Sequence, residues 1–288
     1  TYLKDYKISL ALLLNLNKND MKKQLRTVFY FLFSLFLLLI FGNFISKNTI
    51  DSDDKNWISI FNGEDLSGWN MKVRYFDYGD NHLNTFKVEN GNLKVSYENY
   101  DSFDDKFGHI FYTKRKFKDY HLSLEYKFSG KHLKGAPGWS VKNSGIMLHC
   151  QDPSTMLIDQ EFPVSAEVQL LGGLNKGERT TANICSPGTE VDIDNKLAKK
   201  HCNNSNSKTF HNDDWVKVEV IVNSNKKVQH IVEGDTVLSY TNIKVGGNKV
   251  PSNYLVKIGE SIEEGYISLQ SEGHPVEFRN IKVREIDF

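Results

Sequence analysis

The chain has 288 residues, with 36 Lys and Arg against 36 Asp and Glu, and 39% of its residues are hydrophobic. This balance is typical of a globular protein and excludes disordered, collagen-like and multi-pass membrane proteins. The charge is unevenly spread, because residues 1–46 hold six basic and two acidic residues, leaving 30 basic and 34 acidic ones, a net of −4, in the remainder. That mildly acidic remainder argues against a nucleic-acid partner, since nucleic acid selects for clustered positive charge.

An export segment is predicted near the N-terminus. Met21 begins the basic stretch MKKQLR, and 15 of the 18 residues from 28 to 45 are apolar. This pattern is typical of a signal peptide, and the run also approaches the length of a membrane-spanning helix. We therefore expect an upstream extension (1–20), a signal peptide or N-terminal anchor (21–46) and a linker (47–56). The folded part is expected in the periplasm, at the cell surface or secreted, with membrane contact only through an uncleaved N-terminal segment.

Twelve short β-rich runs follow, separated by turn signals such as Asn90-Gly91 and Gly246-Gly247. They lie at 57–61, 85–90, 92–97, 108–113, 120–128, 144–150, 166–171, 215–222, 227–234, 236–240, 265–270 and 276–286. No segment after residue 50 shows a sustained helical period. The pattern predicts an all-β fold, an antiparallel two-sheet jelly-roll sandwich, as a single domain over residues 57–288.

Side-chain alternation within three of these runs predicts a polar patch on one sheet face. On this alternation His149, Glu167, Gln169 and Gln270 point away from the core, and Cys150 points toward it. Imidazole, carboxylate and amide groups suit sugar hydroxyls, which both donate and accept hydrogen bonds. An antiparallel strand with one wet face shows the same alternation without any function, so the patch requires the three strands to be neighbours.

The chain has three cysteines, Cys150, Cys185 and Cys202. Export permits a disulfide, and we expect one between Cys185 and Cys202, with Cys150 free and buried. The adjacent His-Cys pairs lack the usual spacing of zinc ligands, so no metal site is predicted there. No cofactor is predicted, although a calcium ion in the acidic loop around Asp101 and Asp104 remains an open alternative.

Several segments resemble one known family. FNGEDLSGW (61–69) resembles its opening signature, and ISLQSEGHPVEFRNIKVREI (267–286) resembles its closing signature. Residues 143–146 with His149, and the run 167–170, are similar to its central motifs. The family is that of the 3-keto-disaccharide hydrolases, formerly a domain of unknown function, and the resemblance spans about residues 57–288. It implies a concanavalin-like jelly roll that cleaves glycosides carrying a ketone at sugar carbon 3.

The activity that the resemblance implies needs few catalytic groups. A 3-ketone acidifies the hydrogen at C2, so a general base can remove it and the substituent at C1 can leave by β-elimination. Such a site needs a base, donors that stabilise the enolate, and an acid for the leaving oxygen. We assign Glu167 first and His149 second as the catalytic groups. The residues predicted to bind the substrate are Asn143, Gln169, Gln270, Glu272, His274 and Trp139.

Two other classes of function stay open. A non-catalytic carbohydrate-binding sandwich would use the same polar face without turnover. A conventional glycoside hydrolase would pair Glu167 with a second carboxylate such as Glu272. Both direct hydrolysis and elimination followed by hydration stay open as the route of cleavage, as do the sugar and the linkage.

Overall fold

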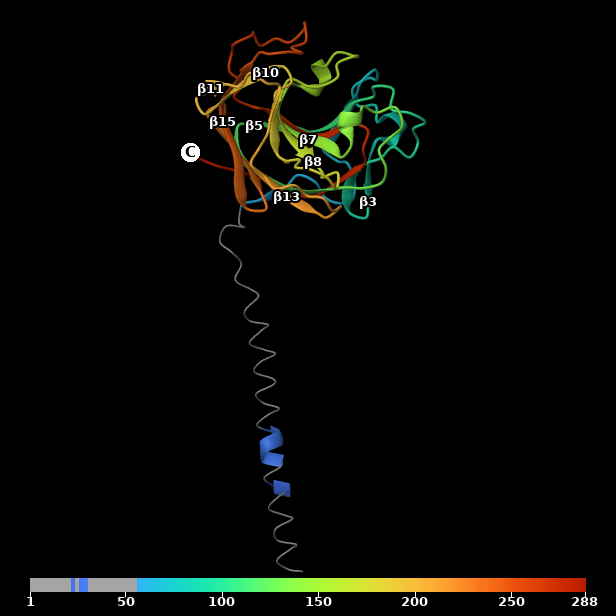
Figure 1. The fold of residues 1–288 in the computed structure, drawn as a ribbon, viewed down its shortest axis with the longest axis vertical. Helices are drawn as coiled ribbons and strands as arrows, with labels where there is room; N and C mark the ends of the chain where they lie inside the picture. The colour runs from blue at the N-terminus through green and yellow to red at the C-terminus, as the bar shows by residue number, and fades with distance from the viewer. Residues whose placement is uncertain (1–21, 24–25, 31–55) are drawn as a thin grey trace, which may run out of the picture. The chain divides into compact units, whose positions relative to one another are not determined.

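The computed structural model describes residues 22–23, 26–30 and 56–288, and residues Asn56–Phe288 form one compact unit (Figure 1). The upstream extension, nearly all of the predicted linker and most of the predicted signal or anchor segment lie outside the described residues. Residues 22–23 and 26–30 are helical. Among the residues that the structure describes, no helix has both the length and the apolar character needed to cross a bilayer.

The compact unit consists of two antiparallel sheets. The larger sheet has the order β11-β10-β15-β14-β13-β6-β17-β4-β3, and β1 also pairs with β17. In chain order its strands are β1 (Ile58–Ser59), β3 (Phe86–Glu89), β4 (Asn92–Val95), β6 (Asp119–Phe128), β10 (Thr189–Ile193), β11 (Lys196–Leu197), β13 (Val216–Asn223), β14 (Lys227–Val232), β15 (Asp235–Val245) and β17 (Val276–Glu285).

The smaller sheet has seven strands in the order β12-β9-β8-β7-β16-β5-β2. They are β2 (Trp69–Val73), β5 (Gly108–Phe117), β7 (Asn143–Cys150), β8 (Ala166–Leu171), β9 (Asn183–Cys185), β12 (Cys202–Asn203) and β16 (Gly265–Ser271). Short 3-10 helices η2 (His82–Asn84), η3 (Gly138–Ser140) and η4 (Pro153–Thr155) lie in the connections. The predicted all-β antiparallel two-sheet sandwich is confirmed.

One hydrophobic core lies between the two sheets. Val218 and Val220 of β13 are fully buried in it, as are Val168 and Leu170 of β8. β-branched residues fit this position because their stiff side chains pack well on a pleated surface, and each fully buried side chain contributes roughly 1.5–3 kcal/mol. The intervening residues of each strand point away from the core, and on the smaller sheet they form the face that matters for function.

The three strands that carry the predicted polar patch are neighbours. β8 pairs with β7, and β7 pairs with β16, so all three lie side by side within the smaller sheet. Figure 1 shows β7 and β8 together in the middle of the folded unit. The adjacency on which the polar patch depends is therefore present.

Candidate functional site

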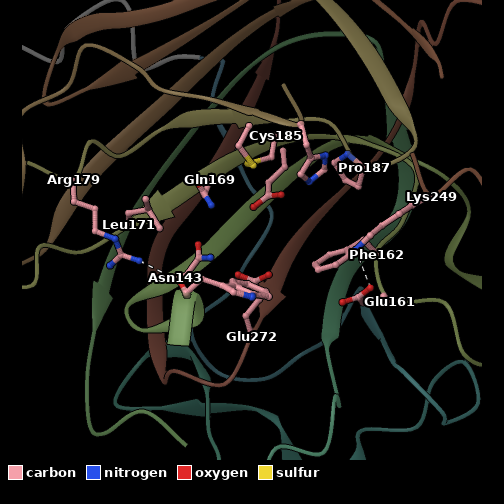
Figure 2. Close-up of a pocket in the computed structure, with 14 residues that line it drawn as sticks. Asn143, Glu161, Phe162, Gln169, Leu171, Arg179, Cys185, Pro187, Lys249 and Glu272 are labelled. Carbon is pink, nitrogen blue, oxygen red and sulfur yellow. Dashed lines mark hydrogen bonds and ion pairs between the residues drawn. A yellow bond between two sulfur atoms is a disulfide. The ribbon is translucent and has the colours of Figure 1, made fainter. Parts of the chain in front are cut away.

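A pocket of about 440 Å³ opens on the face of the smaller sheet that is turned away from the core. Figure 2 shows Asn143 near its centre, with Arg179 on one side and Phe162, Lys249 and Glu161 on the other. The residues that line it are Trp139, Asn143, Glu161, Phe162, Glu167, Gln169, Leu171, Arg179, Cys185, Pro187, His201, Cys202, Lys249 and Glu272.

Glu167 is a buried carboxyl group in this pocket. It lies on β8 opposite Met147 of β7, and its residue is 5% exposed. Burial raises the pKa of Glu167 to about 8, and the positive charge of Lys249 opposes that rise. A carboxylate with a raised pKa is a stronger base than an exposed one, so this position suits proton removal near neutral pH.

Glu272 is a second buried carboxyl group in the same pocket. It directly follows β16, is 3% exposed, and its Oε2 atom has no hydrogen-bond partner within the described part of the chain. Burial raises the pKa of Glu272 well above its ordinary value, and the negative charges of Glu167 and Glu161 raise it further. Two such carboxyl groups resist being ionised together, so one tends to keep a proton while the other accepts one.

Gly145 leaves space between the strands for two polar side chains. A Cβ atom added at Gly145 would lie 2.8 Å from Oε1 of Glu167 and 3.0 Å from Oε1 of Gln270. The carboxyl group from β8 and the amide from β16 therefore converge above this glycine on β7. Gln270 is fully buried, and neither its Oε1 nor its Nε2 has a hydrogen-bond partner among the described residues.

Three further predicted residues line the pocket. Oδ1 of Asn143 is buried without a hydrogen-bond partner in the described chain, and Gln169 Oε1 accepts a hydrogen bond of 3.1 Å from Nδ2 of Asn183. Trp139 is 53% exposed, and its ring stacks on Phe107 with the two ring planes 5° apart. An exposed indole at the edge of a polar pocket provides a flat apolar surface for a sugar ring.

The structure does not place His149 with Glu167. His149 has a φ of 52° at a register shift in the pairing of β7 with β16, and this bulge breaks the alternation. Its Nε2 lies 3.1 Å from the carbonyl oxygen of Ser224, its ring meets Tyr120, and it borders a second pocket of about 730 Å³. Cys150 instead clusters with Met147 on the outer face. The predicted faces of His149 and Cys150 are both wrong.

His274 also lies apart from the residues that line the pocket. Its ring stacks against His132 at 5.9 Å between centroids and meets the edge of Phe128 at 5.6 Å. Burial lowers the pKa of His274 to about 4, and the neighbouring His132 lowers it further. His274 therefore packs within the loop that follows β16, its Nδ1 is buried without a hydrogen-bond partner in the described part of the chain, and its contact with the substrate stays a prediction.

The pocket contains several residues that sequence reasoning missed. Nη1 of Arg179 donates to the carbonyl oxygens of Gly172 and Lys142 at 2.6 and 3.2 Å. On the opposite side, Lys249 forms a 2.8 Å ion pair with Glu161 and lies 4.4 Å above the ring of Phe162 (Figure 2). These residues lie on connections, where no strand pattern could have identified them.

The predicted disulfide is confirmed. Cys185 of β9 and Cys202 of β12 are bonded, and both line the pocket (Figure 2). Cys150 is free and buried, as expected. Within the described residues, no group of three or more His, Cys, Asp or Glu side chains is arranged to hold a metal ion.

The fold and the pocket define a two-sheet jelly-roll protein with a carboxyl-lined polar site on one sheet face. A family model described as the 3-keto-alpha-glucoside-1,2-lyase-like domain matches residues 56–284, and the chain belongs to this family. The resemblance predicted from the two end signatures is therefore confirmed. No curated protein matches the chain.

Solved structures similar to this chain have low sequence identity to it. A candidate glycosyl hydrolase from Parabacteroides distasonis is 18% identical, with a TM-score of 0.46 over 83% of this chain and 98% of that one. The carbohydrate-binding module CBM66 from Bacillus subtilis is 7% identical, with a TM-score of 0.44 over 76% and 96%. The exoplasmic domain of VIP36, bound to calcium and Man3GlcNAc, is 12% identical, with a TM-score of 0.47 over 82% and 90%.

Proposed function

We propose that this protein is an exported enzyme that cleaves 3-keto-glycosides by elimination across C1 and C2, after which water adds to the product. The observation that carries the proposal is the pair of buried carboxyl groups, Glu167 and Glu272, in one pocket with raised pKa values. The family description, a 3-keto-alpha-glucoside-1,2-lyase-like domain, supports the same reaction class. Export rests on the basic and apolar stretch that begins at Met21.

In the proposed reaction, the carboxylate of Glu167 removes the proton from C2 of the keto sugar. The electron pair of the C2–H bond moves into a C2=C3 double bond, and the pair of the ketone π bond moves onto the ketone oxygen, which gives the enolate. The enolate then collapses: C3=O is restored, the C1=C2 double bond forms, and the C1–O bond breaks with its electrons leaving on the departing oxygen. Glu272, whose pKa is raised further by the charge of Glu167, supplies a proton to that oxygen. Hydration then adds hydroxyl to C1 and a proton to C2, so no external oxidant or reductant is needed.

The rest of the pocket supports the binding of a sugar. Asn143 has an unpartnered buried oxygen among the described residues, and Gln169 presents an amide that a sugar hydroxyl can reach. Leaving a buried polar atom unpaired costs roughly 1–3 kcal/mol, so a hydroxyl-rich ligand recovers energy by pairing with it. Trp139 offers the apolar surface for the ring that leaves.

A conventional glycoside hydrolase is the second candidate, because such enzymes also use two carboxyl groups in one pocket as catalytic residues. In that mechanism Glu167 and Glu272 would act on an unoxidised sugar. A non-catalytic carbohydrate-binding sandwich is the third, and would bind through the same residues without turnover.

One assay separates the three functions. The purified protein is incubated with a 3-keto-disaccharide and, separately, with its unoxidised parent. Cleavage of the keto sugar alone supports the proposal, cleavage of the parent supports a conventional hydrolase, and binding of either without cleavage supports a binding module. Glu167→Gln tests the base, and Glu190→Gln is the matched control, since Glu190 forms an ion pair with Lys244 outside the pocket.

A further inference from the structure

A row of polar side chains crosses the smaller sheet beyond the pocket. Lys72 of β2 lies opposite His109 of β5, and His109 lies opposite Gln270 of β16. All three are at most 2% exposed, although each carries a polar group on the outer face of the sheet. Polar groups are seldom buried in this number without hydrogen-bond partners, so the row calls for a physical explanation.

Two members of the row, His109 and Gln270, have buried polar atoms without hydrogen-bond partners among the described residues. Nε2 of His109 and both polar atoms of the Gln270 amide are buried without a hydrogen bond inside the described ranges. Lys72, by contrast, is fully engaged, because its Nζ donates to the carbonyl oxygens of Phe76, Val73 and Ile158 at 2.7, 3.1 and 3.2 Å. The unpaired polar atoms of His109 and Gln270 therefore lie on neighbouring strands, next to the buried positive charge of Lys72.

Phe162 separates His109 from the open pocket. Its ring lines the pocket, and its edge meets the imidazole of His109 with 5.9 Å between ring centroids. On the other side of the row, Gln270 reaches toward the space above Gly145, where it converges with Glu167. A ligand that displaces the Phe162 ring would meet His109, Gln270 and Glu167 together.

We propose that His109 and Gln270 form a subsite for the ketone oxygen of the substrate, with the Phe162 ring as its cover. This inference rests on the proposed function and adds residues to it. In elimination the ketone oxygen gains negative charge as the enolate forms, and preorganised donors at that oxygen stabilise it most in a site without water. Glu167, across Gly145, is then on the side of the sugar from which C2–H is removed.

His109 would act as a neutral donor. Burial lowers the pKa of His109 to about 3, and the charge of Lys72 lowers it further, so its imidazole is uncharged at working pH. A neutral imidazole still has one N–H, which can donate to a carbonyl oxygen. The nearby Lys72 ammonium favours negative charge on the ketone oxygen without transferring a proton, because its donors are occupied.

The variants follow from the chemistry of the donor. His109→Leu removes it, and His109→Gln keeps an amide N–H near the position of Nε2. Because Nε2 is unpaired in the described structure, His109→Leu is expected to fold with a melting temperature equal to or above that of the wild type. A lower melting temperature would instead indicate a structural role. His230→Gln is the matched control, since His230 is also fully buried but lies on β14 of the larger sheet, outside the pocket.

The test combines turnover with binding. With a 3-keto-disaccharide, His109→Leu is expected to lower kcat at least a hundredfold, with His109→Gln intermediate and His230→Gln unchanged. Binding is measured by calorimetry in the inactive Glu167→Gln variant, with and without His109→Leu. Adding His109→Leu should weaken the affinity for the keto sugar at least tenfold and leave the affinity for the unoxidised parent unchanged. The subsite is overturned if the wild type cleaves the keto sugar but His109→Leu leaves both kcat and the affinity for the keto sugar, relative to its unoxidised parent, unchanged. Failure of the wild type to cleave it overturns the proposed function itself.

Discussion

Glu167 of β8 and Glu272 at the end of β16 are two buried carboxyl groups that share one pocket, and the charge of the first raises the pKa of the second. β7 lies between their strands, and Gly145 on that strand leaves the space that Glu167 occupies. The sheet order thus brings together two residues that are 105 positions apart in the sequence. With both carboxyl groups in one pocket, Glu272 can hold a proton while Glu167 accepts another from the substrate.

The activity is expected to rise with pH. The base form of Glu167 is its carboxylate, and burial raises the pKa of that group to about 8. The pH profile of kcat/KM for a 3-keto-disaccharide should therefore climb through the neutral range and reach half of its plateau near pH 8. A profile that is already flat from pH 5 would show that Glu167 is not the titrating base.

Lys249 tunes this pH dependence. Its positive charge lowers the pKa of Glu167 against the effect of burial, so Lys249→Met should shift the rising limb of the profile to higher pH by roughly half a unit. Lys244→Met is the control, because Lys244 pairs with Glu190 outside the pocket. If the two variants have the same pH profile of kcat/KM, Lys249 does not affect the pKa of Glu167.

Glu167 is expected to destabilise the folded protein at neutral pH. The native state keeps the proton of Glu167 up to about pH 8, whereas the unfolded chain releases it near the ordinary pKa of 4.5. The free energy of unfolding therefore falls as pH rises between these values. Glu167→Gln should match the wild type at pH 4 and exceed it by roughly 3 kcal/mol at pH 7, measured by urea unfolding. A gain of the same size at both pH values would contradict the assignment.

Gly145 is expected to tolerate no side chain. Gly145→Ala puts a methyl group 2.8 Å from Oε1 of Glu167 and 3.0 Å from Oε1 of Gln270, so both groups must move. We expect kcat/KM to fall at least tenfold while the protein remains folded. Gly138→Ala is the matched control, because a Cβ there meets no atom within 4 Å in the described structure. Activity kept in Gly145→Ala would show that the convergence above this glycine is not needed for turnover.

The Cys185–Cys202 disulfide should stabilise the wall of the pocket. The two cysteines are separated by 17 positions in the sequence. Losing such a disulfide lowers the free energy of unfolding by roughly 3 kcal/mol, because the unfolded chain regains conformational entropy. A reductant should therefore lower the melting temperature of the wild type and leave that of a Cys185→Ala, Cys202→Ala double variant unchanged. A wild type insensitive to reductant would contradict this account.

Sequence patterns predicted most of the fold because the long strands alternate clearly. The runs at 120–128 and 215–222 appear as β6 and β13, and both bury their alternating inward-facing apolar residues in one core. β2 and the short strands β9 to β12 were not predicted. β9 and β12 span only three and two residues, and they pair with each other where the disulfide joins them. A pairing that depends on a distant cysteine leaves no periodic signal.

The site was predictable only where alternation holds. Glu167 and Gln169 lie on the outer face as the pattern requires, whereas the bulge at His149 reverses the pattern over its last two residues. His109 could have been found, since it alternates with Ile110 in the run 108–113. Arg179 and Lys249 reach the pocket from connections, so only the folded structure reveals them.

The measurement that tests the central claim most directly is the position of deuterium in the product. Wild-type protein and Glu167→Gln are incubated with a 3-keto-disaccharide in D2O, and the released keto sugar is analysed by NMR. Elimination followed by hydration predicts deuterium at C2 of the product formed by the wild type, with no enzymatic release by Glu167→Gln. Release of a product that retains the original hydrogen at C2 would contradict it.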